Sequence, residues 1–299
     1  VVLGGPGTGK TSFLVDAALA HIRAGGSADE IMFVTPSKES ATRIRNEIFG
    51  ALSGGEQYAG TGALVRSVHS WAFAYYRAHM VEQGEVAPRL ISGAEHDIVI
   101  RELLREHART STGPWPGDVR EAVGYVGFAR QLRDVLLRAT ERGVGPQQLR
   151  ELGMNYNRPM WTAAAEFLRE YQGVANLAGS VDVNASELLH KANEVMEAAM
   201  GSEAMQRRMS AVKLLLVDDA HNLDPAAARF VEYFMPSAER VAIAGDPDQC
   251  VFHFRGADEA FLTRYAKEAD SARGSRIILS RSHRLTAQAC LAINHLQTR

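Results

Sequence analysis

The stretch Val1–Thr11, VVLGGPGTGKT, sets the fold: three apolar residues, a glycine-rich run, then a lysine and a threonine. From Gly4 onward it fits the pattern GxxxxGK followed by Ser or Thr. Helical spacing of apolar residues follows, through Phe13, Leu14, Ala17, Ala18 and Ile22. A strand, this turn and a helix predict an anion site of backbone N–H groups at the helix N-terminus. The alternative, a flexible glycine turn, leaves the lysine–threonine pair unexplained.

The residue types of this turn indicate which anion it binds. Gly7 and Gly9 allow backbone N–H groups to approach phosphate oxygens closely, and Lys10 supplies a point charge between the β- and γ-phosphates. The Thr11 hydroxyl is suited to ligate Mg²⁺. We therefore expect ATP and Mg²⁺ as cofactors. The predicted nucleotide-binding residues of the turn are Gly5, Gly7, Thr8, Gly9, Lys10, Thr11 and Ser12.

A second stretch, LLLVDDAHNLD (Leu214–Asp224), supplies the carboxylates that such a site needs. Four apolar residues predict a buried strand, and ligands of open α/β sheets bind where such strands end. We expect Asp218 to hold Mg²⁺ through water and Asp219 to orient and deprotonate the attacking water. The alternative is a pair of solvated aspartates that cap a helix, but Asp224 before Pro225 is the better cap.

Composition sets the limits of the interpretation. A length of 299 residues favours about two domains, and 46% hydrophobic with 23% charged residues is ordinary for a soluble globular protein. No apolar run approaches the ~20 residues of a membrane span, so we expect no membrane partner. The net charge of −2 means that any nucleic acid would bind through a local surface.

The two cysteines and the first residue carry further expectations. Cys250 and Cys290 have no CxxC partner, which suggests a reducing, cytoplasmic compartment, no disulfide frame and no zinc site. The sequence begins with Val1 inside an apolar run, so we expect further sequence upstream.

Strand and helix patterns alternate near both ends of the sequence and predict a parallel sheet with right-handed crossovers. From about residue 79 to 209 the periodicity is helical, with almost no strand signal. We therefore expect one α/β domain interrupted by an all-helical insertion. The predicted strands after the first are Ile31–Val34, Leu64–Val65, Lys213–Val217, Arg240–Ala244 and Ile277–Leu279.

Six elements resemble, in order, the motifs of superfamily 1 helicases of the UvrD/Rep/PcrA type. GGPGTGKT resembles motif I, VTPSKESATRIR (34–45) motif Ia, and SVHSWAF (67–73) the family's T-x-H-S-F element. LLLVDDAHNLD resembles motif II, IAGDPDQCVFHFRGAD (243–258) motif III, and LSRSHRLT (279–286) motif IV. The resemblance implies a RecA-like P-loop NTPase domain (1A) over 1–78 and 210–278. It also implies a helical 1B insertion over 79–209 and a truncated start of domain 2A over 279–299.

The resemblance assigns further residues to the nucleotide. Gln249 falls on the glutamine that senses the γ-phosphate, and Arg284 falls on the arginine that reaches it, where bidentate geometry favours arginine. These two join Lys10 and Asp219 as predicted catalytic residues. His283 stands where the family usually stacks a tyrosine on adenine. Asp219 replaces the family's usual glutamate, and His221 stands where a glutamine is common.

The resemblance also predicts a contact surface for single-stranded DNA. Phe252 and Phe254 fall on aromatics that stack on bases, worth ~1–3 kcal/mol per base, with Arg255 beside them. Thr35, Ser37 and His69 would contact the phosphate backbone from loops. Pro36 stands where an aromatic often stacks. Core packing of the VFHF stretch and a purely structural His69 remain alternatives.

The resemblance implies an ATP-dependent 3′-to-5′ single-stranded-DNA translocase or helicase of bacterial repair or recombination. Its expected partners are single-stranded DNA and duplex junctions. Motifs V and VI lie outside this sequence, so we expect the isolated chain to hydrolyse little ATP. VDDAHNLD looks most like AdnA/AdnB-type helicase–nuclease subunits, which implies a second subunit as a further partner. The alternatives are a helicase-derived structural subunit with little ATPase activity, and a small-molecule kinase, which leaves motif III unexplained.

Overall fold

The computed structural model describes residues 1–52, 64–177, 182–269, 274–286, 288, 289 and 292. Contacts divide the chain into two compact units, unit 1 (1–71 and 196–299) and unit 2 (72–195). Unit 1 is built on a six-stranded sheet in which every pairing is parallel. The strand order is β3 (Val65–Ser67), β2 (Ile31–Thr35), β6 (Leu214–Val217), β7 (Arg240–Gly245), β1 (Val2–Gly4) and β8 (Ile277–Leu279). The predicted α/β class with a parallel sheet is confirmed.

Two neighbouring interior strands, β2 and β6, explain the apolar runs of the sequence. Every residue of β2 and β6 is buried, as expected of a parallel sheet that is covered on both faces. They pair in register from Ile31 opposite Leu214 to Val34 opposite Val217. Asp218 follows directly and donates its backbone N–H to Val34 O at 2.9 Å. The carboxylates of motif II therefore begin at the carboxyl edge of the sheet, where ligands bind in this architecture.

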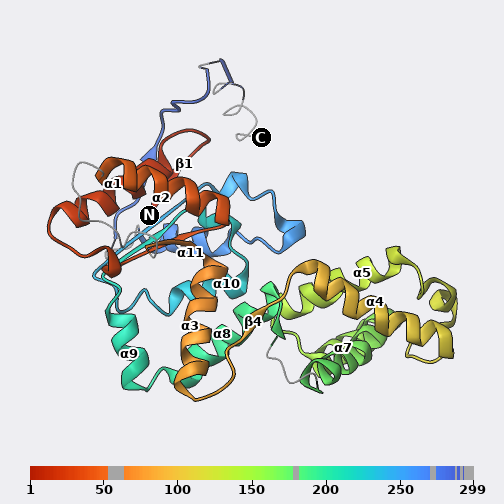
Figure 1. Cartoon of the computed structure of the whole chain (residues 1–299). Helices are drawn as coiled ribbons and strands as arrows, with labels where there is room; N and C mark the ends of the chain where they lie inside the picture. The colour runs from red at the N-terminus through yellow and green to blue at the C-terminus, as the bar shows by residue number, and fades with distance from the viewer. Residues whose placement is uncertain (53–63, 178–181, 270–273, 287, 290–291, 293–299) are drawn as a thin grey trace. The chain divides into compact units, whose positions relative to one another are not determined.

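Helices cover both faces of this sheet. Because parallel crossovers are right-handed, α1 (Lys10–Arg23) and α2 (Lys38–Leu52) lie on one face, and α10 (Pro225–Glu232) and α11 (Ala260–Glu268) on the other (Figure 1). Asp224 caps α10 by accepting from Ala227 N at 2.8 Å, as the Asp-Pro pair predicts. The unit also contains α9 (Glu203–Ser210) and the 3₁₀ turns η1 (Ala28–Glu30), η3 (Ala220–Asn222), η4 (Pro247–Gln249) and η5 (His253–Arg255).

Unit 2 is helical, as the periodicity predicts, apart from one short pair of strands. Two helices, α3 (Val68–Glu82) and α8 (Ala185–Ala199), run across its boundaries without a break, so no composition change marks them. The domain boundaries 79 and 209, taken from the change in periodicity and from the family resemblance, stay a prediction. The remaining elements are β4 (Arg89–Leu90), α4 (Gly93–Thr110), η2 (Gly117–Ala122), α5 (Val126–Glu141), α6 (Pro146–Asn155), α7 (Pro159–Leu177) and β5 (Asp182–Val183).

The core of unit 2 is aromatic at its centre. Trp115 and Phe167 are buried with ring centroids 5.7 Å apart, and both rings contact His107. His107 Nδ1 accepts from Trp115 Nε1 at 3.1 Å, and His107 Nε2 lies 2.9 Å from Glu170 Oε2. Both nitrogens of this buried histidine therefore have partners, so it is satisfied within the fold.

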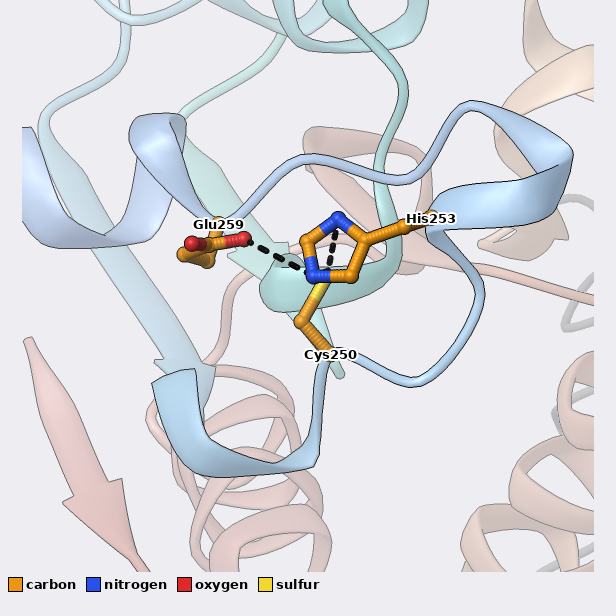
Figure 2. A group of neighbouring side chains, drawn as sticks. All are labelled: Cys250, His253 and Glu259. Atoms are coloured by element: carbon orange, nitrogen blue, oxygen red, sulfur yellow. Dashed lines mark hydrogen bonds and ion pairs between the residues drawn. The ribbon is translucent and has the colours of Figure 1, made fainter.

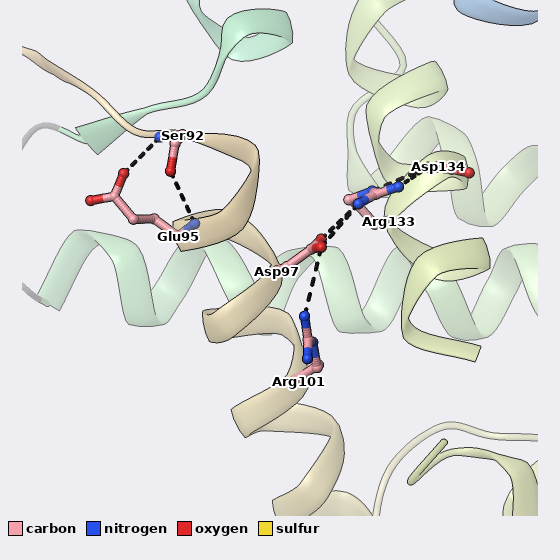
Figure 3. Close-up of polar contacts among 6 residues, drawn as sticks. All are labelled: Ser92, Glu95, Asp97, Arg101, Arg133 and Asp134. Carbon is pink, nitrogen blue, oxygen red and sulfur yellow. Dashed lines mark hydrogen bonds and ion pairs between the residues drawn. The ribbon is translucent and has the colours of Figure 1, made fainter. Parts of the chain in front are cut away.

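The surface of unit 2 shows helix capping and ion pairs (Figure 3). Ser92 and Glu95 form a reciprocal capping box at the start of α4. One turn along, Asp97 accepts two hydrogen bonds from Arg133 of α5, at 2.9 and 3.0 Å, and Arg101 lies 3.9 Å away. These pairs connect α4 to α5 outside the apolar core. Over the described residues, no helix is both long and apolar enough to span a bilayer.

Candidate functional site

The glycine-rich turn has the backbone of an anion cradle. Gly7 and Gly9 have φ of 73° and 93°, a region that side chains rarely adopt, and α1 begins directly after Gly9. Lys10 is buried, and its Nζ donates to Gly4 O at 2.7 Å and to Gly5 O at 3.0 Å. The lysine charge is thus held by carbonyls of its own loop, at the place where phosphate oxygens would compete for it.

Asp218 and Thr11 form the predicted metal pair. The Thr11 hydroxyl lies 2.9 Å from Asp218 Oδ2 and 3.2 Å from Oδ1, so residues 207 positions apart meet at the sheet edge. Asp218 is 1% exposed, and burial, followed by the neighbouring Asp219 charge, raises its pKa to about 7. A divalent cation reverses this effect because it favours the ionised carboxylate. A hydroxyl and a carboxylate are hard oxygen ligands, so the residues fit Mg²⁺.

Asp219 lies next to this pair in an unusual backbone conformation. Its φ of 48° and ψ of 44° are left-handed, which aspartate tolerates better than most residues. The residue is half-buried and lines the same cavity as Lys10 and Thr11. The left-handed turn therefore separates the two adjacent carboxylates into different positions, one beneath the loop and one at the cavity wall.

A cavity of about 710 Å³ brings together residues from the whole length of unit 1. Motif IV closes it: Ser282 Oγ donates to Pro6 O and His283 N donates to Gly7 O, both at 2.8 Å. A Cβ on Gly7 would lie 2.5 Å from Arg284 Cβ, so only glycine allows this approach. Predicted residues lining the cavity are Gly7, Thr8, Gly9, Lys10, Thr11, Ser12, Asp219, Gln249, His283 and Arg284.

Two predicted residues lie outside the cavity lining, and three lining residues, Pro6, Arg43 and Glu47, were not predicted. Gly5 and Asp218 do not line the cavity but contact residues that do. The Gly5 carbonyl accepts from Lys10, and the Asp218 carboxylate accepts from Thr11. Arg43 and Glu47 of α2 line the cavity. Their spacing of four residues places them on one helix face, the only sequence signal that they share. The Arg43 charge also opposes the rise in the pKa of Asp218.

A histidine connects motif II to motif III. His221 is 3% exposed, and its Nδ1 accepts from Asp246 N at 3.2 Å, so the proton of its neutral ring sits on Nε2. Burial lowers the pKa of His221 and keeps it neutral. Nε2 lies 3.1 Å from the side-chain amide of Asn222, which should therefore present its oxygen.

Asp246 extends this connection to the predicted phosphate sensor. Its Oδ1 accepts from Asp248 N at 3.2 Å, and its Oδ2 accepts from the Gln249 side-chain amide. The described chain thus runs a hydrogen-bonded path from the turn after Asp219 to Gln249. The histidine that replaces the common glutamine has a structural partner here.

The predicted DNA-contact aromatics lie on the turn after Gln249. Phe252 and Phe254 are 41% and 70% exposed, and their ring centroids are 6.0 Å apart at an interplanar angle of 54°. Such exposure argues against core packing of the VFHF stretch. Arg255 belongs to η5, and its side chain lies outside the described part of the structure.

The three predicted backbone-contact residues lie in different settings. Thr35 ends β2, so its predicted loop placement is wrong; it is fully buried, and its hydroxyl donates to Ser37 O at 2.9 Å. Ser37 Oγ accepts from Ser40 N at 3.1 Å, as a capping hydroxyl does at the start of α2. His69 lies in the first turn of α3, so its predicted loop placement is wrong. Burial lowers the pKa of His69, which favours a neutral ring.

The chain is similar in sequence to several curated DNA helicases. The chain is 26% identical over 298 residues to DNA helicase II of Salmonella typhimurium, covering 99% of this chain and 38% of that protein. DNA helicase II of Escherichia coli is 25% identical over 298 residues, with the same coverage. ATP-dependent DNA helicase UvrD2 of Mycobacterium tuberculosis is 23% identical over 303 residues, covering 99% of this chain and 40% of that protein.

The chain therefore spans about two fifths of the length of these relatives. The model of the UvrD/REP helicase N-terminal domain matches residues 1–270, which include the glycine-rich turn, both motif II carboxylates and the Gln249 turn. The chain therefore belongs to the UvrD/REP helicase N-terminal domain family.

Proposed function

We propose that this chain is the ATP-binding motor part of a 3′-to-5′ single-stranded-DNA translocase or helicase in bacterial DNA repair or recombination. One observation carries the proposal: a single cavity is lined by Lys10, Asp219, Gln249 and Arg284 above the Thr11–Asp218 pair. Phosphoryl transfer needs positioning and charge neutralisation more than covalent chemistry, and these groups supply both. The direction of movement and the repair role rest on the family resemblance.

Each residue has a separate part in hydrolysis. Thr11 and Asp218 would hold Mg²⁺, which neutralises charge on the phosphates when bound. Lys10 leaves the Gly4 and Gly5 carbonyls and binds the β- and γ-phosphates. Asp219, at the cavity wall, orients the attacking water and accepts its proton. Arg284 stabilises the charge that develops on the γ-phosphate, and Gln249 reads its presence without adding charge.

The same turn connects hydrolysis to DNA. Gln249 ends η4 only three positions before Phe252, so a shift of the amide toward phosphate moves the base of the aromatic turn. Phe252 and Phe254 would stack on bases, and the family resemblance adds Arg255, Ser37 and His69 as further contacts to the strand. Thr35 orders the Thr35–Ser37 turn through its buried hydroxyl. The partners are single-stranded DNA and duplex junctions, and by resemblance a second helicase–nuclease subunit.

The test measures binding, because turnover depends on groups outside these motifs. Isothermal titration with Mg²⁺-ATP should show binding by the chain and at least a tenfold loss in Lys10→Ala. Fluorescence anisotropy with labelled oligothymidylate should show a loss in Phe254→Ala of about fivefold or more, given ~1–3 kcal/mol per stacked base. Equal nucleotide affinity of Lys10→Ala and the unaltered chain would sink the motor proposal and favour a structural subunit.

A further inference from the structure

A cysteine, a histidine and a glutamate converge beside the aromatic turn (Figure 2). Cys250 follows Gln249 and is buried, His253 begins η5, and Glu259 stands at the N-terminus of α11. Cys250 Sγ lies 3.8 Å from His253 Nδ1, and His253 Nε2 lies 3.6 Å from Glu259 Oε2. One ligand atom from each side chain lies within 4.8 Å of the other two. None of the three belongs to the nucleotide cavity.

The histidine ring is oriented so that one nitrogen is available. His253 Nδ1 lies 3.1 Å from the Ala257 carbonyl oxygen, which can only accept, so Nδ1 carries the proton. In the neutral ring Nε2 then holds a lone pair that faces the Glu259 carboxylate. A backbone carbonyl that binds the other ring N–H is the usual support of a metal-ligating histidine.

The Glu259 carboxylate provides a second observation that bears on a cation between it and the His253 ring. Within the described residues, Glu259 Oε2 is closed off from solvent without a hydrogen bond of regular geometry. The carboxylate lies between the Cys250 thiol, which donates to it, and the His253 ring, 3.6 Å from Oε2. Opposite the lone pair of a neutral ring this oxygen has no donor, so the contact needs either a proton on Nε2 or a metal ion between the two groups. A cation placed between them satisfies both at once.

We propose that Cys250, His253 and Glu259 bind a divalent transition-metal ion, Zn²⁺ foremost, with a fourth position left to water. Thiolate, imidazole and carboxylate are all zinc ligands, and three protein ligands plus water is a common zinc set. Bonds of about 2.0–2.3 Å separate tetrahedral ligand atoms by roughly 3.3–3.8 Å, which the 3.6 Å pair already meets. The ligand atoms lie within 4.8 Å of one another, so small side-chain rotations of Cys250 and Glu259 that keep the Nδ1–Ala257 bond complete the set.

Binding requires the thiol to lose its proton to solvent. Burial and the Glu259 carboxylate raise the pKa of Cys250 to about 11, so without an ion the thiol is neutral. A bound divalent cation deprotonates a ligating thiol outright and offsets the glutamate charge. The sequence expectation of no zinc site considered only cysteine pairs, so it did not address a mixed Cys–His–Glu set.

The position of the site suggests its consequence, beyond the proposed motor function. The ligands at 250, 253 and 259 enclose the turn that carries Phe252 and Phe254, so a bound ion pins both ends of that turn. Holding an exposed aromatic pair in one conformation reduces the ordering cost of stacking on a base.

The experiment titrates the chelator-treated 299-residue chain with Zn²⁺, and separately with Co²⁺ as a spectroscopic probe. We expect one equivalent to bind, with a thiolate-to-Co²⁺ charge-transfer band. Saturating Zn²⁺ should raise the melting temperature by roughly 5 °C, since binding at 100-fold excess over Kd stabilises a domain of this size to that extent. Cys250→Ser should abolish the band, while Cys290→Ser, the matched control, should keep it.

Two further variants protect the test against misfolding. His253→Ala and Glu259→Gln change exposed or half-exposed side chains, so both should fold and both should weaken Zn²⁺ binding at least tenfold. Circular dichroism confirms the fold of each variant before titration. A Co²⁺ band that survives in Cys250→Ser, or Zn²⁺ affinity weaker than millimolar in the unaltered chain, overturns the site. Neither result touches the nucleotide cavity, so the motor function is tested separately.

Discussion

Buried polar groups serve opposite purposes in the two units. In unit 2, the nitrogens of buried His107 are taken by Trp115 and Glu170 within the helical core. In unit 1, Asp218 is equally buried but sits beside a second carboxylate, and its pKa rises to about 7. The fold satisfies both nitrogens of His107, whereas burial and the Asp219 charge disfavour the ionised form of Asp218. A cation beside Asp218 would favour the ionised form.

The largest expected effect tests the packed side of this comparison. Phe167→Ala removes a fully buried ring that contacts Trp115 and His107, and should cost about 3–5 kcal/mol of unfolding free energy. Urea unfolding measures it, and Mg²⁺-ATP binding should persist because every cavity residue lies in unit 1. Tyr125→Ala, an aromatic that is 70% exposed, is the control and should shift stability by about 0.5 kcal/mol or less. A small effect of Phe167→Ala would contradict a packed core.

The next effect tests the buried carboxylate of unit 1, Asp218. Asp218→Asn removes a buried charge but keeps an acceptor for Thr11, so at pH 8 without nucleotide it should stabilise the chain by about 1–3 kcal/mol. The gain should shrink as pH falls below 7, because the native aspartate is then protonated too.

Mg²⁺ should strengthen ATP binding by the unaltered chain, and in the same variant this strengthening should be at least tenfold smaller. Titration calorimetry with and without Mg²⁺ measures both affinities. Asp16→Asn, an exposed aspartate of α1, is the matched control and should change neither quantity. If Asp218→Asn lowered the stability and left the effect of Mg²⁺ on ATP affinity unchanged, the predicted role of Asp218 as a metal ligand would be wrong.

A smaller effect concerns the ion pairs on unit 2. Asp97→Asn breaks the two-bond contact with half-buried Arg133 and should cost about 1 kcal/mol, less at high salt (Figure 3). Glu106→Gln breaks the more exposed pair with Arg109 and should cost close to nothing. Chemical denaturation at two salt concentrations measures the unfolding free energy of both variants. Equal losses of unfolding free energy would show that burial does not decide how much these ion pairs stabilise the fold.

The smallest effect is a pH dependence in unit 2. Burial lowers the pKa of His96, whose ring packs against Tyr171, so the folded state favours the neutral ring. Stability from this residue is full above pH 6.5, the ordinary histidine value, and falls as pH drops toward the lowered pKa. His96→Phe should flatten this slope between pH 7 and 5 in thermal unfolding. A nuclear magnetic resonance titration that places the His96 pKa above 6.5 would contradict the sign.

Much of the architecture was predictable because local patterns express it directly. The apolar runs of β2 and β6 predict strands covered on both faces, and the glycine-rich turn predicts an anion site. The unit boundaries were not predictable, because α3 and α8 continue through them with unbroken helical periodicity. The strands β4 and β5 escaped because two-residue strands have no measurable alternation. His69 was misplaced because β3 gives way to α3 without any turn residue.

The sequence alone determined that the chain has an α/β sheet with a glycine-rich turn between its first strand and first helix, a helical middle, and the motif order of its family. Those features follow from residue types at short spacing, which physical periodicity expresses. Tertiary structure decided which distant groups meet: Arg43 at the nucleotide cavity, His221 against Asp246, and Cys250 with His253 and Glu259. Contact and burial depend on how segments pack across the fold, and one-dimensional spacing carries no record of that packing.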